Sequence, residues 1–310
     1  MSAIETSNLT KRFNGLTAVD DLNLRIEPGT LYGFIGPNGA GKTTTLRLLA
    51  GLLEPTAGDI RLAGQDIRQD PEAARWLVGY MPDFFGVYED MMVWEYLDFF
   101  ARCYNLPAGR RARLVDELLA LVDLDGKRDD YVENLSRGMR QRLCLAHTLV
   151  HDPEILLLDE PASGLDPRAR VEMRELLREL QRMGKTIIVS SHILSELAEM
   201  CDQVGIIERG RLLISGSMDE VRRHLRHEKT IRLKVISDLE AARAALAAYP
   251  GVGQVFEVNG GLEAGFVGDE EATAGLLAHL VHHGVKVTNF TEDVTDLEDV
   301  FLQITKGEVQ

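Results

Sequence analysis

The stretch Gly36-Pro37-Asn38-Gly39-Ala40-Gly41-Lys42-Thr43-Thr44 decides the fold. A glycine followed after four residues by Gly-Lys-Thr is the P-loop pattern, which binds phosphate. The apolar run 31–35 before it predicts a short buried strand, and the run 43–50 after it, apolar at 46, 49 and 50, predicts a helix. A Gly-rich turn that binds nothing is the alternative, but Lys-Thr-Thr at this spacing has little other use.

The P-loop residues have distinct expected roles. Glycines let several backbone N–H groups point at one anion, and the start of the following helix adds its positive dipole end. Lys42 is expected to reach the β- and γ-phosphates, and the Thr43 hydroxyl to hold Mg²⁺. The cradle itself is predicted to consist of Gly36, Pro37, Asn38, Gly39, Ala40, Gly41 and Thr44. The chain is therefore predicted to bind ATP, with Mg²⁺ as its metal.

Two later apolar runs, 155–158 and 186–189, each end in polar residues. Continuous apolar runs suit parallel strands buried on both faces, and ligands bind beyond the carboxyl ends of such strands. Asp159 is therefore expected beside the metal, Glu160 beside the γ-phosphate as the base that polarises a water, and His192 near the terminal phosphate. A solvated acidic turn and an ordinary surface histidine are the alternative interpretations.

With these residues the chain resembles the ATP-binding subunit of ABC transporters, over about residues 3 to 225. The resemblance rests on an ordered set of motifs: Phe13, the P-loop 36–44, Asp83, Leu135-Ser136-Arg137-Gly138-Met139, Asp159-Glu160, Ser163-Gly164-Leu165-Asp166 and His192. The stretch 135–139 corresponds to the signature of this family, which separates it from P-loop kinases and switch GTPases.

The resemblance implies two subunits facing each other head to tail, with each ATP between the P-loop of one and the signature of the other. Ser136, predicted to cap a helix running to about residue 150, and the Gly138 amide are expected to contact the γ-phosphate across the interface. Phe13 is expected to stack on adenine, and Asp166 to touch the partner's site. Because the chain carries both half-sites and Glu160, a homodimer is the simpler expectation; a heterodimer with one impaired partner is the alternative.

Three positions depart from the family's pattern. Arg137 and Met139 stand where the commonest signature has Gly and Gln, but ATPase activity is expected to survive because Gly138 is retained. Arg137 is interpreted either as added positive charge near the phosphates or as a solvent-facing helix arginine. Asp83 stands where the family usually places a Gln. It can hold Mg²⁺ through a water but, as an acceptor only, it cannot donate to the attacking water.

Composition limits the partners and the compartment. The chain has 49 Asp and Glu against 34 Lys and Arg, a formal net charge of -15, which argues against nucleic acid and against direct binding to anionic lipid. No apolar run reaches the length of a membrane span. Cys103, Cys144 and Cys201 are unclustered and indicate free thiols in a reducing compartment. We expect a cytoplasmic protein that reaches the inner face of the cell membrane through an integral membrane permease.

Residues 80–104 contain nine aromatic side chains. Apolar spacing over 93–104 predicts a helix in the core of a helical subdomain. Phe84, Phe85 and Tyr88 precede this helix in an irregular segment, where core burial explains them less well, so a protein-docking site is the competing interpretation. In the resembling family, this region is the groove that receives a short helix of the membrane subunit.

The pattern changes after the charged segment 222–228. Strands at 230–236, 252–258, 262–267 and 285–290 and helices at 238–248 and 270–283 give the order βαββαβ, which is typical of a ferredoxin-like domain. An amphipathic helix is predicted at 295–302. The predicted fold class is α/β: an ABC-type P-loop nucleotide-binding domain with a helical subdomain at 1–225, and a small α+β accessory domain, for dimerisation or regulation, at 229–310. A looser resemblance links this accessory domain to the drug- and polymer-export branch of the family.

The predicted function is therefore that of the ATPase subunit of an ABC exporter. ATP binding closes the dimer, hydrolysis reopens it, and a separate permease converts the motion into transport. A soluble ABC ATPase acting on DNA or the ribosome is the alternative. Such proteins carry a long coiled-coil insertion or two tandem nucleotide domains, and this sequence has neither.

Overall fold

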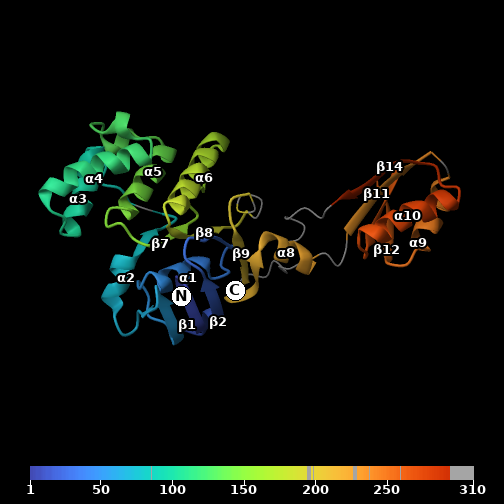
Figure 1. The fold of residues 1–310 in the computed structure, drawn as a ribbon, viewed down its shortest axis with the longest axis horizontal. Helices are drawn as coiled ribbons and strands as arrows, with labels where there is room; N and C mark the ends of the chain where they lie inside the picture. The colour runs from blue at the N-terminus through green and yellow to red at the C-terminus, as the bar shows by residue number, and fades with distance from the viewer. Residues whose placement is uncertain are drawn as a thin grey trace. The chain divides into compact units, whose positions relative to one another are not determined.

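The computed structural model describes residues 1–84, 86–193, 197, 199–225, 229–236, 238–258 and 260–293. The chain forms two compact units, which separate after Met218 (Figure 1). The predicted domain limits, 1–225 and 229–310, stay a prediction. None of the described helices combines the length and the apolar character that crossing a bilayer requires.

A six-stranded sheet with the order β10-β9-β3-β8-β7-β6 forms the centre of the first unit. Its strands are β3 (Leu31–Ile35), β6 (Val78–Met81), β7 (Ile155–Asp159), β8 (Thr186–Ser191), β9 (Gln203–Glu208) and β10 (Arg211–Ser217). All pairs are parallel except β9 with β10. Every residue of β3, β7 and β8 is buried, which explains the apolar runs that make up most of these strands. The strands predicted before the P-loop and before the two polar ends are confirmed.

A second, antiparallel sheet has the order β2-β1-β4-β5 and consists of β1 (Ile4–Phe13), β2 (Leu16–Ile26), β4 (Ala57–Leu62) and β5 (Gln65–Asp66). One buried cluster combines residues of both sheets with three leucines of α1 (Lys42–Leu49), namely Leu46, Leu48 and Leu49. All three leucines are fully buried. The helix that begins at the P-loop is therefore anchored in the core, which fixes the position of the loop.

The helical subdomain contains α3 (Val93–Cys103), α4 (Ala108–Leu121) and α5 (Arg137–Thr148), which contact one another (Figure 1). On α3, Val93, Tyr96 and Leu97 are buried, as the helical spacing predicts. The described residues of this unit also form α2 (Pro71–Leu77), the short 3₁₀ turns Asp125–Lys127 and Val132–Asn134, and α6 (Pro167–Arg182). The boundary between the units falls within α8 (Met218–Leu225).

The second unit is an antiparallel sheet with the order β12-β13-β11-β14 and two helices that share its buried core. Its elements are β11 (Lys229–Val235), α9 (Leu239–Ala247), β12 (Val252–Val258), β13 (Gly261–Phe266), α10 (Glu270–His282) and β14 (Val287–Asp293). This order confirms the ferredoxin-like prediction.

The last strand was predicted two residues too early. Gly284, with φ +80°, follows the end of α10, and Val285 is buried in the core without belonging to the strand. An apolar residue that packs in the core from a connection has the same pattern as the first residue of a strand. The predicted helix 295–302, Phe85 and Asn259 of the predicted hairpin turn lie outside the described residues.

Candidate functional site

At two glycines of the loop between β3 and α1, the neighbouring backbone leaves no room for a side chain. A Cβ on Gly36 would lie 2.3 Å from the carbonyl oxygen of Ile207, and a Cβ on Gly41 would lie 2.4 Å from that of Ala18. Gly41 also has φ +105°, which side-chain-bearing residues rarely adopt. Helix α1 starts at Gly41 with no side-chain cap and no acidic residue in its first turn. The backbone amides at this helix start and their dipole are thus available to an anion.

Lys42 places a buried ammonium group on this loop. Its side chain is 7% exposed, and Nζ donates to the carbonyl oxygens of Gly36 at 2.6 Å and Pro37 at 3.4 Å. The Nζ atom also lies 3.5 Å from Oε1 of Glu160. Burial lowers the pKa of Lys42, and the charge of Glu160 opposes that change. A buried cation needs such partners, and here they hold it against the phosphate cradle.

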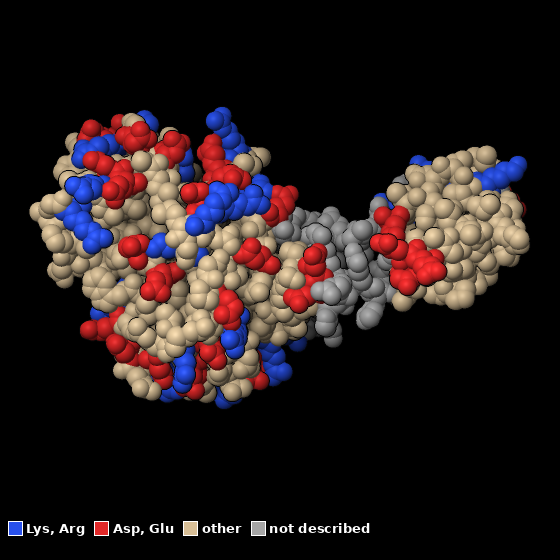
Figure 2. Space-filling view, viewed as in Figure 1, with Lys and Arg blue, Asp and Glu red and all other residues tan. Residues whose placement is uncertain are grey.

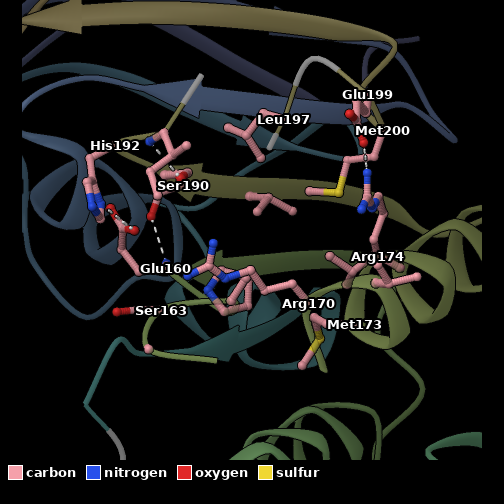
Figure 3. Close-up of a pocket in the computed structure, with 18 of the residues that line it drawn as sticks. Glu160, Ser163, Arg170, Met173, Arg174, Ser190, His192, Leu197, Glu199 and Met200 are labelled. Atoms are coloured by element: carbon pink, nitrogen blue, oxygen red, sulfur yellow. Dashed lines mark hydrogen bonds and ion pairs between the residues drawn. The ribbon is translucent and has the colours of Figure 1, made fainter. Parts of the chain in front are cut away.

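The predicted catalytic residues follow neighbouring strands of the central sheet. The P-loop follows β3, His192 follows β8, Glu160 follows β7, and Asp83 follows β6, in the order in which these strands lie side by side. His192 Nδ1 lies 3.0 Å from Oε2 of Glu160 (Figure 3). Lys42, Glu160 and His192 therefore form one contiguous cluster. Asp83 is exposed, and its charge acts to raise the pKa of Lys42.

Glu160 has an unusual backbone that a serine supports. Its φ is +50°, in the left-handed region that costs a non-glycine residue about 1–2 kcal/mol. The Glu160 N–H donates to Oγ of Ser190 at 3.0 Å, and the Ser190 hydroxyl donates to Oδ1 of Asp159 at 2.7 Å. Ser190 thus connects both acidic residues at the strand end. Sequence reasoning did not single it out, although a polar residue directly after the apolar run 186–189 was a usable signal.

Asp159 fits a metal ligand. Its side chain is buried, and Oδ2 has no hydrogen-bond partner among the described residues. A buried carboxylate oxygen normally has a partner. Mg²⁺ usually takes one or two carboxylates, several waters and the phosphates of a nucleotide. Asp159 and the half-buried Thr43 at the start of α1 supply donors of that kind.

The signature residues form a second group, on other elements. Ser136 caps α5 and accepts from the Met139 N–H at 3.3 Å, and Asp166 caps α6 and accepts from the Ala169 N–H at 2.9 Å. A Cβ on Gly138 would lie 3.4 Å from Cβ of Ala169. Ser136, Gly138 and Asp166 line one hollow of about 220 Å³ between the starts of α5 and α6. The predicted cap at Ser136 is confirmed.

Phe13 lies at the end of β1 and is 41% exposed. The Lys11 ammonium lies 5.0 Å from the centre of its ring. The ring is therefore accessible to a planar ligand, and its stacking on adenine stays a prediction.

A cavity of about 480 Å³ opens beside the cluster of charged residues (Figure 3). Glu160 and His192 line it at one end, and Arg170, Met173 and Arg174 of α6 line it from the other side. The carboxylate and the imidazole thus face open space, which a reacting water needs in order to approach them.

Comparisons with known proteins agree with this geometry. The family described as "ABC transporter" matches residues 19–163, and the family described as "ATP-binding protein DrrA1-3-like, C-terminal domain" matches residues 216–305. The "Nod factor export ATP-binding protein I" of Burkholderia lata is 37% identical over 314 residues, which cover 100% of this chain and 99% of that protein. The "Uncharacterized ABC transporter ATP-binding protein YhcH" of Bacillus subtilis is 36% identical with the same coverage.

A solved structure described as "Structure of ATP binding subunit of ABC transporter" has a TM-score of 0.65 and 30% identity, and the match covers 72% of this chain and 93% of that one. Fold, site and sequence similarity thus indicate one family. This chain belongs to the ATP-binding proteins of ABC transporters, the ATPases whose nucleotide hydrolysis is coupled to transport.

Proposed function

We propose that the protein is the energy-coupling subunit of an ABC exporter and that two copies enclose ATP between them. One observation carries this proposal. The cluster of Lys42, Glu160 and His192 lies beyond the carboxyl ends of the central strands, whereas the signature hollow at Ser136 and Gly138 lies between the starts of α5 and α6. Each chain then supplies one half of two pockets, and a second copy completes both.

The residues of the first half have distinct proposed roles in hydrolysis. Glu160 accepts the proton of the attacking water, and His192, 3.0 Å from it, orients that water and the terminal phosphate. Lys42 exchanges its loop carbonyls for phosphate oxygens. Thr43 and Asp159 would hold Mg²⁺, and Asp83 would contribute to its site through a water. When bound, the metal ion neutralises charge on the phosphates.

The direction of transport is proposed from the relatives. The Burkholderia lata protein is named for export of Nod factor, and it matches this chain along its whole length, including the C-terminal unit. We propose export for this chain as well, with the cargo selected by the permease. The predicted domain 229–310, which overlaps most of the second unit, is proposed to serve in dimerisation or regulation.

A role on DNA or the ribosome receives no support from the surface charge. The chain has a formal net charge of -15. On the face seen in Figure 2, basic side chains are interspersed with acidic ones and form no continuous basic stripe over the described residues. Nucleic-acid backbones require such a stripe.

A cysteine-pair experiment tests whether the two half-sites face each other. Asn38 in the P-loop and Ser136 at the start of α5 are both exposed. We expect an Asn38→Cys, Ser136→Cys double variant, in a Glu160→Gln background with exposed Cys103 changed to Ser, to form a covalent dimer under mild oxidation only when ATP is present. The two single-cysteine variants are the controls. A double variant that retains bound ATP but stays uncross-linked contradicts the shared pocket.

Attachment to the permease is proposed to use the aromatic segment before α3. Phe84 is 90% exposed and Tyr88 is 53% exposed, and the Tyr88 ring packs edge-on against Phe99 at 5.5 Å. Exposed aromatic side chains beside an ordered aromatic cluster are typical of a protein-docking surface. The protein would thereby be held at the cytoplasmic face of the membrane.

A charge at Phe84 tests this attachment. We expect Phe84→Glu to lose co-fractionation with membranes that contain the permease, because a carboxylate would be buried at the interface. ATPase activity of the isolated subunit should be unchanged, since the side chain contributes little to the core. Met183→Glu, at an exposed residue after α6, is the matched control and should stay bound. Retention of the Phe84 variant on those membranes refutes the docking role.

A further inference from the structure

Two side chains of α5 donate to a single backbone carbonyl in the loop that follows Glu160. Arg137 Nη2 donates to the carbonyl oxygen of Ser163 at 2.9 Å, and Gln141 Nε2 donates to the same oxygen at 3.1 Å. Residues four apart lie on one face of a helix, so both reach the same point. A Cβ on Gly164 would lie 2.3–2.5 Å from atoms of the Arg137 guanidinium, which therefore lies directly against the loop backbone.

Arg137 is exposed, as expected for a solvent-facing helix arginine. Neither expectation for this residue included the contact of its guanidinium with the carbonyl oxygen of Ser163. The signal was not readable from the sequence, because the acceptor is a main-chain oxygen 26 residues away. A glycine at position 137, as in the commonest signature, would have no side chain to make the contact.

Further hydrogen bonds fix the same loop, residues 160–165. The Ser163 N–H donates to the carbonyl oxygen of Glu160 at 3.0 Å, which closes a turn, and the Glu160 N–H donates to Ser190 (Figure 3). Arg170 Nε donates to the carbonyl oxygen of Leu165 at 3.0 Å. Ser163, whose carbonyl oxygen α5 holds, is therefore hydrogen-bonded through its own N–H to the carbonyl oxygen of Glu160.

The left-handed backbone of Glu160 depends on the contacts that fix this loop. A non-glycine residue keeps a left-handed φ only where its surroundings determine that conformation. Ser190 holds the N–H side of Glu160, and the turn to Ser163 holds its carbonyl side. If the loop is released from α5, Glu160 can relax to a more ordinary φ and turn its carboxylate away from Lys42 and His192.

We propose that Arg137 and Gln141 are positioning residues that couple the signature end of α5 to Glu160. This inference rests on the proposed function, in which Ser136 and Gly138 face the ATP that the partner copy holds. Contact with that nucleotide fixes the start of α5. The hydrogen bonds from α5 to the Ser163 carbonyl transmit this constraint to Glu160, the proton acceptor in the chain's own pocket. The two pockets of the dimer then act together rather than independently.

Two donors on one acceptor predict a specific pattern among variants. A carbonyl oxygen accepts two hydrogen bonds, so either donor alone keeps the loop attached. We expect Arg137→Met and Gln141→Met each to lower kcat about threefold and the double variant to lower it about thirtyfold or more, which exceeds the product of the single effects. Arg137→Lys retains a donor and should recover most of the kcat lost in Arg137→Met.

Steady-state ATP hydrolysis by the full chain measures these effects. KM for ATP should stay within about twofold, because these residues act on Glu160 rather than on the nucleotide. The Hill coefficient for ATP should fall toward one in the double variant, because the pockets become independent. Arg182→Met removes an exposed α6 arginine that pairs with Glu179 one turn away on the same helix, and it serves as the matched control. Thermal unfolding identifies any variant that fails to fold, in which case the Met and Lys variants at 137 decide the question.

The outcomes separate this inference from the proposed function. An unchanged kcat in the double variant overturns the coupling, and so does a higher KM at unchanged kcat, which would place Arg137 on the phosphates. Glu160→Gln is measured in parallel. If that variant is inactive while the double variant is normal, only the coupling fails. If Glu160→Gln itself hydrolyses ATP at the ordinary rate, the proposed function fails.

Discussion

In a Glu160→Gln variant, ATP stays bound, hydrolysis falls by about 10²–10⁴-fold, and closed dimers accumulate. The amide has nearly the shape of the carboxylate but cannot take a proton from water, so the chemical step stops while the pocket stays intact. The change also removes the negative charge 3.5 Å from Lys42, which frees the ammonium for the phosphates.

Scattering and ATP turnover, measured on the same sample at saturating ATP, test this expectation. Glu154→Gln is the matched control, because Glu154 precedes the same strand at its opposite end and is exposed. It should keep both ordinary turnover and ordinary association. Normal hydrolysis in Glu160→Gln would remove Glu160 from the role of base. A strictly monomeric protein, even beside its permease, would refute the enclosure of ATP by two copies.

Replacement of Lys42 by Ala should lower the affinity for ATP, or turnover, by about a hundredfold or more. A buried, charge-assisted contact to phosphate is lost, and at about 1.4 kcal/mol per tenfold such a contact readily accounts for that factor. The change also leaves the carboxylate of Glu160, whose side chain is only 13% exposed, without its nearest cation.

Equilibrium binding of a fluorescent ATP analogue and steady-state turnover measure the two effects separately. Lys185→Ala is the matched control, because Lys185 is similarly buried, pairs with Asp152 and lies at the opposite end of the central sheet, before β8. It should change stability but leave nucleotide affinity unaltered. If Lys42→Ala binds and hydrolyses ATP at the ordinary affinity and rate, the assignment of residues 36–44 as the phosphate cradle is wrong.

The sequence predicted those features that depend on residues close together in the chain. The P-loop, the buried strands before it and before Asp159, and the Ser136 cap each arise from a local pattern that determines a local structure. The neighbourhood of Glu160 and His192 was predictable because the carboxyl ends of parallel strands meet at one edge of a sheet.

Contacts between a side chain and a distant main-chain atom could not be predicted in the same way. The contact of Arg137 with the Ser163 carbonyl depends on how α5 packs beside the loop, and no spacing in the sequence encodes a main-chain acceptor. The support that Ser190 gives to Glu160 depends on the register of β7 and β8. Val285 was assigned to a strand because burial in a connection and burial in a strand give the same apolar pattern.

The left-handed backbone of Glu160 has a consequence for how such a protein can be altered. Glycine or asparagine accepts that conformation at lower energy than glutamate, so either would relieve tension in the native state while removing the proton acceptor. A selection for thermal stability alone would therefore favour glycine or asparagine at position 160 and would yield stable proteins without ATPase activity. Stability and catalysis thus place opposite demands on this residue, and a stabilised variant that remains active would need its substitutions elsewhere in the chain.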